Sequence, residues 1–105
     1  MSSGPPNVLL VILDSARARN TSLHGYHRET TPFLDSFAKS ATQYTQARSP
    51  AGWSLPSHAS IFTGALPQEH KFNSLDSRLD TGVSIFEWLS NKGYSTGLFT
   101  DNPYL

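Results

Sequence analysis

The sequence contains no cysteine, and this absence excludes disulfide bonds, a thiolate nucleophile and any metal site built on sulfur. A net charge is also absent, because eight Lys and Arg balance eight Asp and Glu. Without an excess of charge the chain has no general attraction to nucleic acid or anionic lipid, so neither partner is expected. The 105 residues allow one modest domain with a small core.

Long apolar runs are missing as well. The longest, Val8–Leu13, is far shorter than the roughly 20 residues that a membrane-spanning helix needs. The first six residues have neither the basic start nor the apolar body of a targeting signal. The sequence therefore predicts a cytoplasmic chain without a membrane partner, with a flexible N-terminus at residues 1–6.

Three stretches have the composition of β-strands. Val8–Leu13 is an uninterrupted apolar run that ends at Asp14, which is typical of a strand buried on both faces of a parallel sheet. Shorter strands are predicted over residues 42–47 and 94–100, where Thr and Tyr are frequent.

Three helices are predicted between these strands, from apolar spacing and from Pro and Gly at the expected ends. Their ranges are 32–40, 56–63 and about 83–92. Residues 65–80 have no period and are predicted to be a long connection. The alternation predicts an α/β fold, a partial sandwich in which helices flank a mainly parallel sheet. Because the last strand is not followed by a crossover, we interpret residues 7–105 as the N-terminal part of an incomplete domain.

Asp14 directly follows the most apolar strand. Ligands of open α/β sheets bind at the carboxyl ends of the strands. A carboxylate oxygen suits Ca²⁺, Mg²⁺ or Mn²⁺ and also occurs in mixed zinc sites. We therefore interpret Asp14 as a metal ligand, while noting that a loop-capping role uses the same residue type.

A second polar cluster lies at the start of the helix predicted from Pro56, where Ser54 comes just before it and His58 lies on its first turn. The N–H groups and the dipole at a helix N-terminus favour an anion such as a sulfuryl or phosphoryl oxygen. A serine hydroxyl becomes a useful nucleophile once a base or a metal lowers the cost of ionising it. The pattern is compatible with ester hydrolysis, and taken alone also with an ordinary helix cap.

The twelve residues from Trp53 to Gly64 resemble the signature of the sulfatase branch of the alkaline-phosphatase-like superfamily. That signature is Cys or Ser, any residue, Pro, Ser, Arg, and an apolar helical stretch that ends in Thr-Gly. The residues in register are Ser54, Pro56, Ser57, Thr63 and Gly64. Further segments resemble the family's first strand, metal loop, first helix and next helix-to-strand passage: Asp14 with Arg17, His24-Gly25-Tyr26, Thr30 to Asp35, and Gly93 to Thr96.

The resemblance implies a metal-dependent sulfuric ester hydrolase. In the family, the signature Cys or Ser is oxidised to formylglycine, whose hydrated aldehyde attacks the sulfate ester, so Ser54 is the implied nucleophile as a hydroxyl or as formylglycine. Asp14 matches the first ligand of the divalent cation, with Ca²⁺ as the first choice and Mn²⁺, Mg²⁺ or Zn²⁺ as alternatives. Arg17 is the implied substrate-binding residue, and His58 is expected to donate to a substrate oxygen.

Two positions depart from the family pattern. Ser15 stands where many sulfatases have a second Asp, which replaces a charged metal ligand with a neutral donor. His58 stands where the signature has Arg, a permanent cation with several donors, and this change also affects recognition by a formylglycine-generating enzyme. Because the family's other metal ligands come from much later in a longer chain, the isolated chain is expected to be inactive.

Two alternative functions remain open from the sequence. Related phosphoesterases and phosphodiesterases use an unmodified hydroxyl, so the substrate is a sulfate or a phosphate ester. A truncated, non-catalytic remnant or an interaction module would carry the same residues, and its expected partner is the C-terminal part of the domain.

The remaining histidines and aromatic residues have ordinary interpretations. We expect His24, His27 and His70 to face solvent without a special role. Packing in a core or between helices is expected for the large aromatic residues Trp53, Phe62, Phe86 and Trp88.

Overall fold

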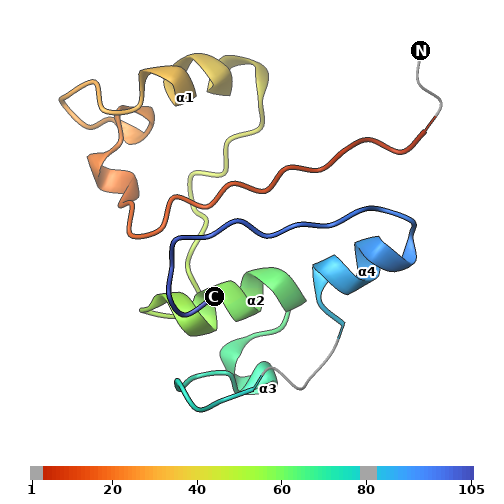
Figure 1. Cartoon of the computed structure of the whole chain (residues 1–105). Coiled ribbons are helices and arrows are strands. Elements are labelled where there is room, and N and C mark those ends of the chain that lie inside the picture. The colour runs from red at the N-terminus through yellow and green to blue at the C-terminus, as the bar shows by residue number, and fades with distance from the viewer. Residues whose placement is uncertain (1–3, 79–82) are drawn as a thin grey trace. The chain divides into compact units, whose positions relative to one another are not determined.

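The computed structural model describes residues 4–78 and 83–105. The chain divides into two compact units, Met1–Gln46 and Ala47–Leu105, and each is described here by itself (Figure 1). Within the described ranges, no helix is long and apolar enough to cross a membrane.

The described residues of the first unit, 4–46, contain one short α-helix and three 3₁₀ turns. These are η1 (Ala18–Asn20), η2 (Ser22–His24), α1 (Pro32–Phe37) and η3 (Ala38–Ser40), which continues α1 directly. The predicted helix over 32–40 is therefore confirmed, although its last turn is a 3₁₀ turn. It begins where expected, because Pro32 at the first position has no N–H to leave unpaired and its φ suits a helix.

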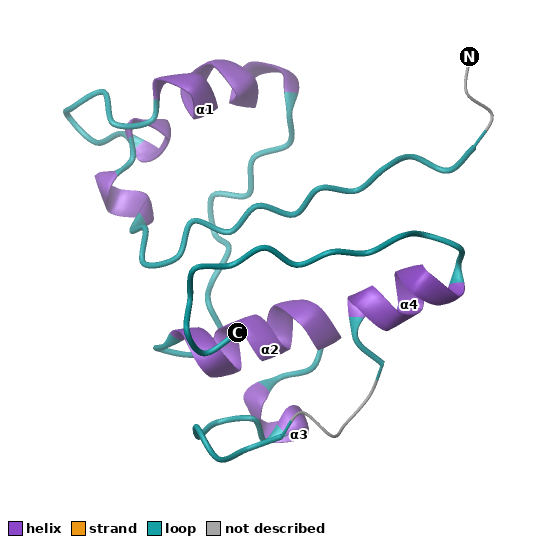
Figure 2. Ribbon diagram, viewed as in Figure 1, coloured by secondary structure: helices purple, strands orange, loops and turns teal. Residues whose placement is uncertain are grey.

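The apolar run Val8–Leu13 does not form a strand in the part of the chain that the structure describes, and neither do residues 42–47 or 94–100 (Figure 2). No backbone hydrogen bond joins Val8–Ile12 to another described residue. Its side chains are between 37% and 86% exposed, at Ile12 and Leu9 respectively. A strand exists only when a neighbouring strand accepts and donates its ladder bonds, so apolar composition at these positions does not make one. The predicted sheet and the predicted burial on both faces are thus absent from the described residues.

The second unit is built around α2 (Ser54–Thr63), which contacts both α3 (Pro67–His70) and α4 (Ile85–Asn91). The helix ends where the sequence predicts, since Gly64 adopts a φ of 71° and its N–H bonds to the Ser60 carbonyl. It begins two residues earlier than predicted, at Ser54, with Trp53 as the extended residue before it. Ser54 is therefore the first residue of the helix and does not lie ahead of it.

Helix α3 corrects the prediction of a structureless connection over 65–80. Pro67 occupies its first turn, and the Leu66 N–H donates to Glu69 Oε2 at 2.6 Å. The prediction that His70 faces solvent is also wrong, because its side chain is only 2% exposed. Residues 79–82, which include the end of the predicted connection, lie outside the described residues.

His70 joins α2 to α3 through both ring nitrogens. Nδ1 accepts the Phe72 backbone N–H at 3.0 Å, so the proton of the neutral ring sits on Nε2. Nε2 then donates to Ser60 Oγ, also at 3.0 Å. The ring thus satisfies one donor and one acceptor in a place without water access, which is the usual condition for burying a polar side chain.

The apolar core of this unit is small. Leu55 and Ala59 are the buried hydrophobic residues among those described, and the Phe62 ring meets the Phe86 ring edge-on at 5.1 Å. Packing between helices is thus confirmed for Phe62 and Phe86. Trp53 and Trp88 are 43% and 52% exposed, so neither lies in the core, and packing between helices stays a prediction for them.

Helix α4 confirms the third predicted helix and begins with a reciprocal cap. Ser84 Oγ accepts the Glu87 N–H, and Glu87 Oε2 accepts both the Ser84 N–H and the Ser84 hydroxyl at 2.9 Å. These two donors, the backbone N–H first, hold the pKa of the Glu87 carboxyl below its ordinary value. A capping box of this kind satisfies two backbone donors that the helix itself cannot pair.

We expect α4 to lose order in acid because of this cap. A carboxyl whose pKa is lowered by folding stabilises the fold above its unfolded-state pKa, and the stabilisation is lost as the pH falls through the lowered folded-state pKa. Ser84→Ala should raise the pKa of Glu87 toward its ordinary value and move the loss of α4 order to higher pH. The measurement is a carbon-detected NMR titration of the Glu87 carboxyl and the α4 Cα shifts. Ser90→Ala, at an exposed site in the same helix, should leave both titrations unchanged.

Candidate functional site

Ser54 is the first residue of α2 and is half-buried. The chain enters it from Trp53 in an extended conformation, with φ −149° and ψ 167°, and then turns directly into the helix. This abrupt change of direction places the Ser54 side chain at the positive end of the ten-residue helix. The position predicted for the nucleophile is therefore at the helix N-terminus.

The loop before Ser54 is tied to the first turn of α2 by two serine hydroxyls. Ser57 Oγ donates to the Trp53 carbonyl at 2.6 Å, and Ser49 Oγ donates to the Ala51 carbonyl at 2.7 Å. The two hydroxyl oxygens are 3.3 Å apart, so the loop and the helix meet at this point. Ser57 thus fixes the residue that precedes the nucleophile and does not itself cap the helix.

The first turn of α2 offers fewer amide donors than a typical helix N-terminus. Pro56 is its third residue and has no N–H. The Ser57 N–H already bonds to the Trp53 carbonyl at 3.4 Å. The first turn of α2 therefore offers an anion fewer backbone N–H donors than the sequence suggests.

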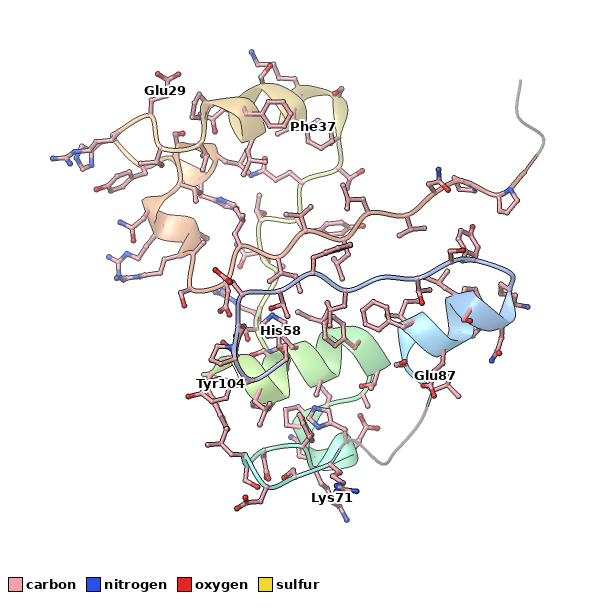
Figure 3. All side chains as sticks on the ribbon, viewed as in Figure 1. Glu29, Phe37, His58, Lys71, Glu87 and Tyr104 are labelled. Atoms are coloured by element: carbon pink, nitrogen blue, oxygen red, sulfur yellow. The ribbon has the colours of Figure 1, made fainter. Side chains whose placement is uncertain are left out.

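His58 lies one turn after Ser54 and is only 5% exposed. Its Nδ1 is 2.7 Å from the Ser54 carbonyl oxygen, and because a carbonyl only accepts, Nδ1 carries the proton. Figure 3 labels His58 on α2. Its ring is also tilted against Phe62, with centroids 5.9 Å apart. One of its two nitrogens is thus committed to the backbone of the predicted nucleophile, and Nε2 is the atom left for a substrate.

Asp14 and Ser15 form the centre of a tight turn in the first unit. The Ala16 N–H bonds to the Leu13 carbonyl at 3.2 Å, and Ser15 adopts a φ of 62°. This left-handed conformation costs a residue with a side chain on the order of 1 kcal/mol, and Asn and Asp tolerate it best. At position 15, where the family pattern has a second Asp, Asp would therefore fit the backbone conformation better than Ser does.

The predicted site residues fall into two pairs. Asp14 and the exposed Arg17 lie three residues apart in the first unit, and Ser54 and His58 lie on one helix in the second. Ser54 and His58 lie one turn apart on α2, whereas Arg17 follows the turn at Asp14 as the residue before η1.

The family model described as Sulfatase matches residues 6–103. The chain belongs to the sulfatase family. It is 30% identical over 104 residues to arylsulfatase A of Bos taurus and 29% identical over 101 residues to that of Homo sapiens, covering 92% and 90% of this chain. It is 26% identical over 103 residues to N-acetylgalactosamine-6-O-sulfatase of Bacteroides thetaiotaomicron, covering 92% of this chain.

This sulfatase chain spans about a fifth of the length of the curated relatives it matches, 20% in each case. No solved structure matches it. Membership of the family implies an alkaline-phosphatase-like fold, of which the described residues supply helices.

Sulfatases are generally metal-dependent, but the donor set in the described residues is incomplete for a metal. No group of three or more His, Asp or Glu side chains gathers there. Asp14 supplies one carboxylate, and its neighbour Ser15 has only a hydroxyl. A divalent cation that prefers six or more oxygen ligands would need several groups from outside these residues.

Sequence reasoning missed two residues that shape the site. Ser49 anchors the loop ahead of α2, and the Ser-Pro pair at 49–50 is a known turn signal that could have indicated it. His70 supports α2 from α3 through Ser60, at a separation of ten residues for which no sequence pattern exists.

Proposed function

We propose that this chain is the N-terminal segment of a metal-dependent sulfuric ester hydrolase in which Ser54 is the nucleophile. The observation that carries the proposal is the position of Ser54 as the first residue of α2, in a chain that the sulfatase model matches over residues 6–103. A nucleophilic oxygen at this end of a helix lies where negative charge on a sulfuryl group is favoured. The proposed substrate is a sulfate ester, because the relatives are named as sulfatases.

Ser54 acts in this proposal as a hydroxyl or, after oxidation, as formylglycine. As a hydroxyl it gives up its proton and attacks sulfur, the bond from sulfur to the ester oxygen breaks, and the leaving alcohol takes up a proton. Water then hydrolyses the sulfated serine, which releases sulfate and restores the hydroxyl. His58 holds the Ser54 carbonyl through Nδ1 and so fixes the backbone that carries the nucleophile. Its Nε2 is the proposed donor to a substrate oxygen.

The residues of the first unit have the remaining proposed roles. Asp14 is proposed to contribute one carboxylate to the divalent cation, Ca²⁺ in the first instance, and Arg17 to contact the charged ester group. The apolar runs around residues 8–13 and 94–100 are proposed to be strands of the mainly parallel sheet in the complete domain. A cytoplasmic location, and the absence of nucleic-acid and membrane partners, are part of the same proposal.

Phosphoester hydrolysis is the second candidate, and the residue at position 58 favours it. The signature Arg is absent, and His58 has one nitrogen committed to the Ser54 backbone. If the change blocks oxidation of Ser54, an unmodified hydroxyl remains, and such a hydroxyl is the nucleophile of related phosphoesterases.

Intact-mass analysis combined with turnover assays tests these assignments. Formylglycine at Ser54 lowers the mass by two hydrogens, about 2 Da, and Ser54→Ala should abolish this loss. In the full-length gene product, Ser54→Ala should reduce turnover of 4-nitrophenyl sulfate at least about 10³-fold, whereas Ser90→Ala should not. The 105-residue chain alone is expected to show no turnover.

The outcomes separate the alternatives. A faster, Ser54-dependent turnover of 4-nitrophenyl phosphate by an unmodified protein would assign a phosphoesterase. Absence of Ser54-dependent turnover of either ester by the full-length product would overturn the hydrolase proposal and leave the non-catalytic module.

A further inference from the structure

The residue before the proposed nucleophile does not cap the helix that begins there. Trp53 occupies the N-cap position of α2 and makes no capping hydrogen bond with its side chain. Ser, Thr, Asp and Asn are preferred at this position because their side-chain oxygens accept a backbone N–H of the first turn, whereas the indole of Trp only donates. Other side chains therefore have to fix the entry of the chain into α2.

Ser57 fixes this entry from within the helix. Its Oγ donates to the Trp53 carbonyl oxygen at 2.6 Å, whereas its backbone N–H donates to the same oxygen at 3.4 Å. A separation of 2.6 Å is short for a hydroxyl donor, and 3.4 Å is longer than usual for an amide donor. Of these two bonds, the one from the hydroxyl is therefore the stronger.

Ser54 lies between two peptide groups that side chains of its own helix hold. The peptide group before it contains the Trp53 carbonyl, which accepts the Ser57 hydroxyl. The peptide group after it contains the Ser54 carbonyl, which accepts His58 Nδ1–H at 2.7 Å. Because peptide groups are planar, the orientations of these two groups define φ and ψ of Ser54. The two bonds together thus fix the direction in which the Ser54 side chain leaves the backbone.

Ser49 supports Ser57 from the loop ahead of α2. Ser49 Oγ donates to the Ala51 carbonyl at 2.7 Å and lies 3.3 Å from Ser57 Oγ. Each hydroxyl has one proton, and its shortest contact is to a carbonyl, so the two serines hold two carbonyls of the same loop. We call Ser49 and Ser57 the serine pair.

We propose that Ser57, supported by Ser49, is a positioning residue that orients Ser54 for attack on the ester. The inference rests on the proposed function, in which Ser54 is the nucleophile, and it assigns Ser57 no contact with the substrate. Reacting atoms need to lie about 3–3.5 Å apart, and a misplacement of about 1 Å costs on the order of 10²-fold in rate. Without the Ser57 hydroxyl, the Trp53 carbonyl keeps the weaker 3.4 Å bond from the amide, and Ser54 loses its fixed direction.

Steady-state kinetics of the full-length gene product test the inference, with whichever of 4-nitrophenyl sulfate and 4-nitrophenyl phosphate it hydrolyses. Ser57→Ala should lower kcat at least about tenfold and change KM less than about twofold, because the contacts to the substrate remain. Ser57→Thr keeps a hydroxyl and should restore most of kcat. The matched control is Thr63→Val, which removes a hydroxyl that donates to the Ala59 carbonyl at 2.6 Å at the other end of α2. This control should leave kcat within about twofold of the original.

The serine pair should act as one unit. Ser49→Ala should lower kcat in the same direction as Ser57→Ala but by a smaller factor. The double variant should lose less than the product of the two single losses, because both residues act on the same loop. Fully multiplicative losses would show that Ser49 does not act through Ser57.

Hydrogen exchange of the same full-length variants distinguishes this inference from the proposed function. Ser57→Ala should speed exchange in the peptide that contains Trp53 and Ser54 at least about threefold, even though Ala favours a helix, and Thr63→Val should not. Unchanged exchange or unchanged kcat in Ser57→Ala would overturn the positioning role, and so would equal losses of kcat in Ser57→Ala and Thr63→Val. Faster exchange in Ser57→Ala, together with turnover that does not depend on Ser54, would instead overturn the proposed function.

Discussion

His70→Ala is expected to destabilise the second unit by about 3 kcal/mol. The substitution leaves the Phe72 N–H and the Ser60 hydroxyl without their partner in a place where the ring was 2% exposed. Each buried polar group left unpaired costs roughly 1–3 kcal/mol, and the space left by the ring adds a cavity cost. Because the apolar core of this unit is small, the loss is a large fraction of its stability.

Urea unfolding, monitored by tryptophan fluorescence, measures the stability of the second unit. Both tryptophans, Trp53 and Trp88, lie in the second unit, so the signal reports that unit and not the first. Gln68→Ala, an exposed change in the same short helix, should alter the free energy of unfolding by less than about 0.5 kcal/mol. Equal effects of His70→Ala and Gln68→Ala would contradict the bridging role of the ring.

A double-mutant cycle with Ser60 isolates the hydrogen bond from the cavity. Ser60→Ala removes only the hydroxyl and should cost about 1–2 kcal/mol, since the His70 Nε2–H is then unpaired. If the two side chains interact, the double variant should cost less than the sum of the single ones. Strict additivity would show that the 3.0 Å contact contributes nothing to the free energy of unfolding.

Helices α1, α2 and α4 could be predicted from the sequence because their signals are local, whereas α3 was not predicted. Pro32 and Gly64 mark a start and an end through their own backbone preferences, and both are found where those preferences place them. Ser84 and Glu87 close a cap within one turn, so α4 also carries its own start signal. Such features need no distant partner.

The lack of strands among the described residues and the His70 bridge could not be predicted in the same way, because both depend on distant partners. The run Val8–Leu13 has strand composition, but a strand needs a neighbour, and the composition does not state where that neighbour comes from. His70 has charged neighbours in the sequence, yet its burial depends on Ser60, a residue of another helix. Charged neighbours in the sequence are therefore a poor guide to whether a titratable side chain is exposed.

The candidate site was predicted in its residue types and only partly in its local geometry. The helix N-terminus at Ser54 follows from Pro56 and Gly64, although the helix includes Ser54 itself. The bond from His58 to the Ser54 carbonyl was not predicted. The two residues are four apart, a spacing that brings them to one face of a helix. His58 was instead expected to donate to a substrate oxygen. In this helix, the Nδ1 atom of His58 is therefore used for a backbone hydrogen bond and is not available to a ligand.

Replacing Leu9 and Val11 by Lys is expected to weaken self-association of the chain by roughly two orders of magnitude. These alternate residues lie on one side of an extended segment, and both are exposed, Leu9 to 86%. The segment has no backbone partner among the described residues, so it offers unpaired N–H and C=O groups together with apolar side chains, the combination that promotes pairing between chains. Burial of each such side chain contributes about 1.5–3 kcal/mol, and 1.4 kcal/mol corresponds to a tenfold change in the dissociation constant.

Sedimentation velocity over a dilution series measures the dissociation constant, and the matched control is Phe33→Lys with Phe37→Lys. Those rings stack at 6.1 Å on the exposed face of α1, so the control removes comparable apolar surface and adds the same charge at helical positions. Backbone pairing between extended segments predicts a large effect of the first double variant and a small effect of the second, since α1 already satisfies its own amides. Equal effects would mean that general apolar contact drives association, and a chain that stays monomeric at high concentration would show that the exposed run does not pair at all. Far-UV circular dichroism of both variants should match the original chain, because neither pair of side chains is buried in its unit.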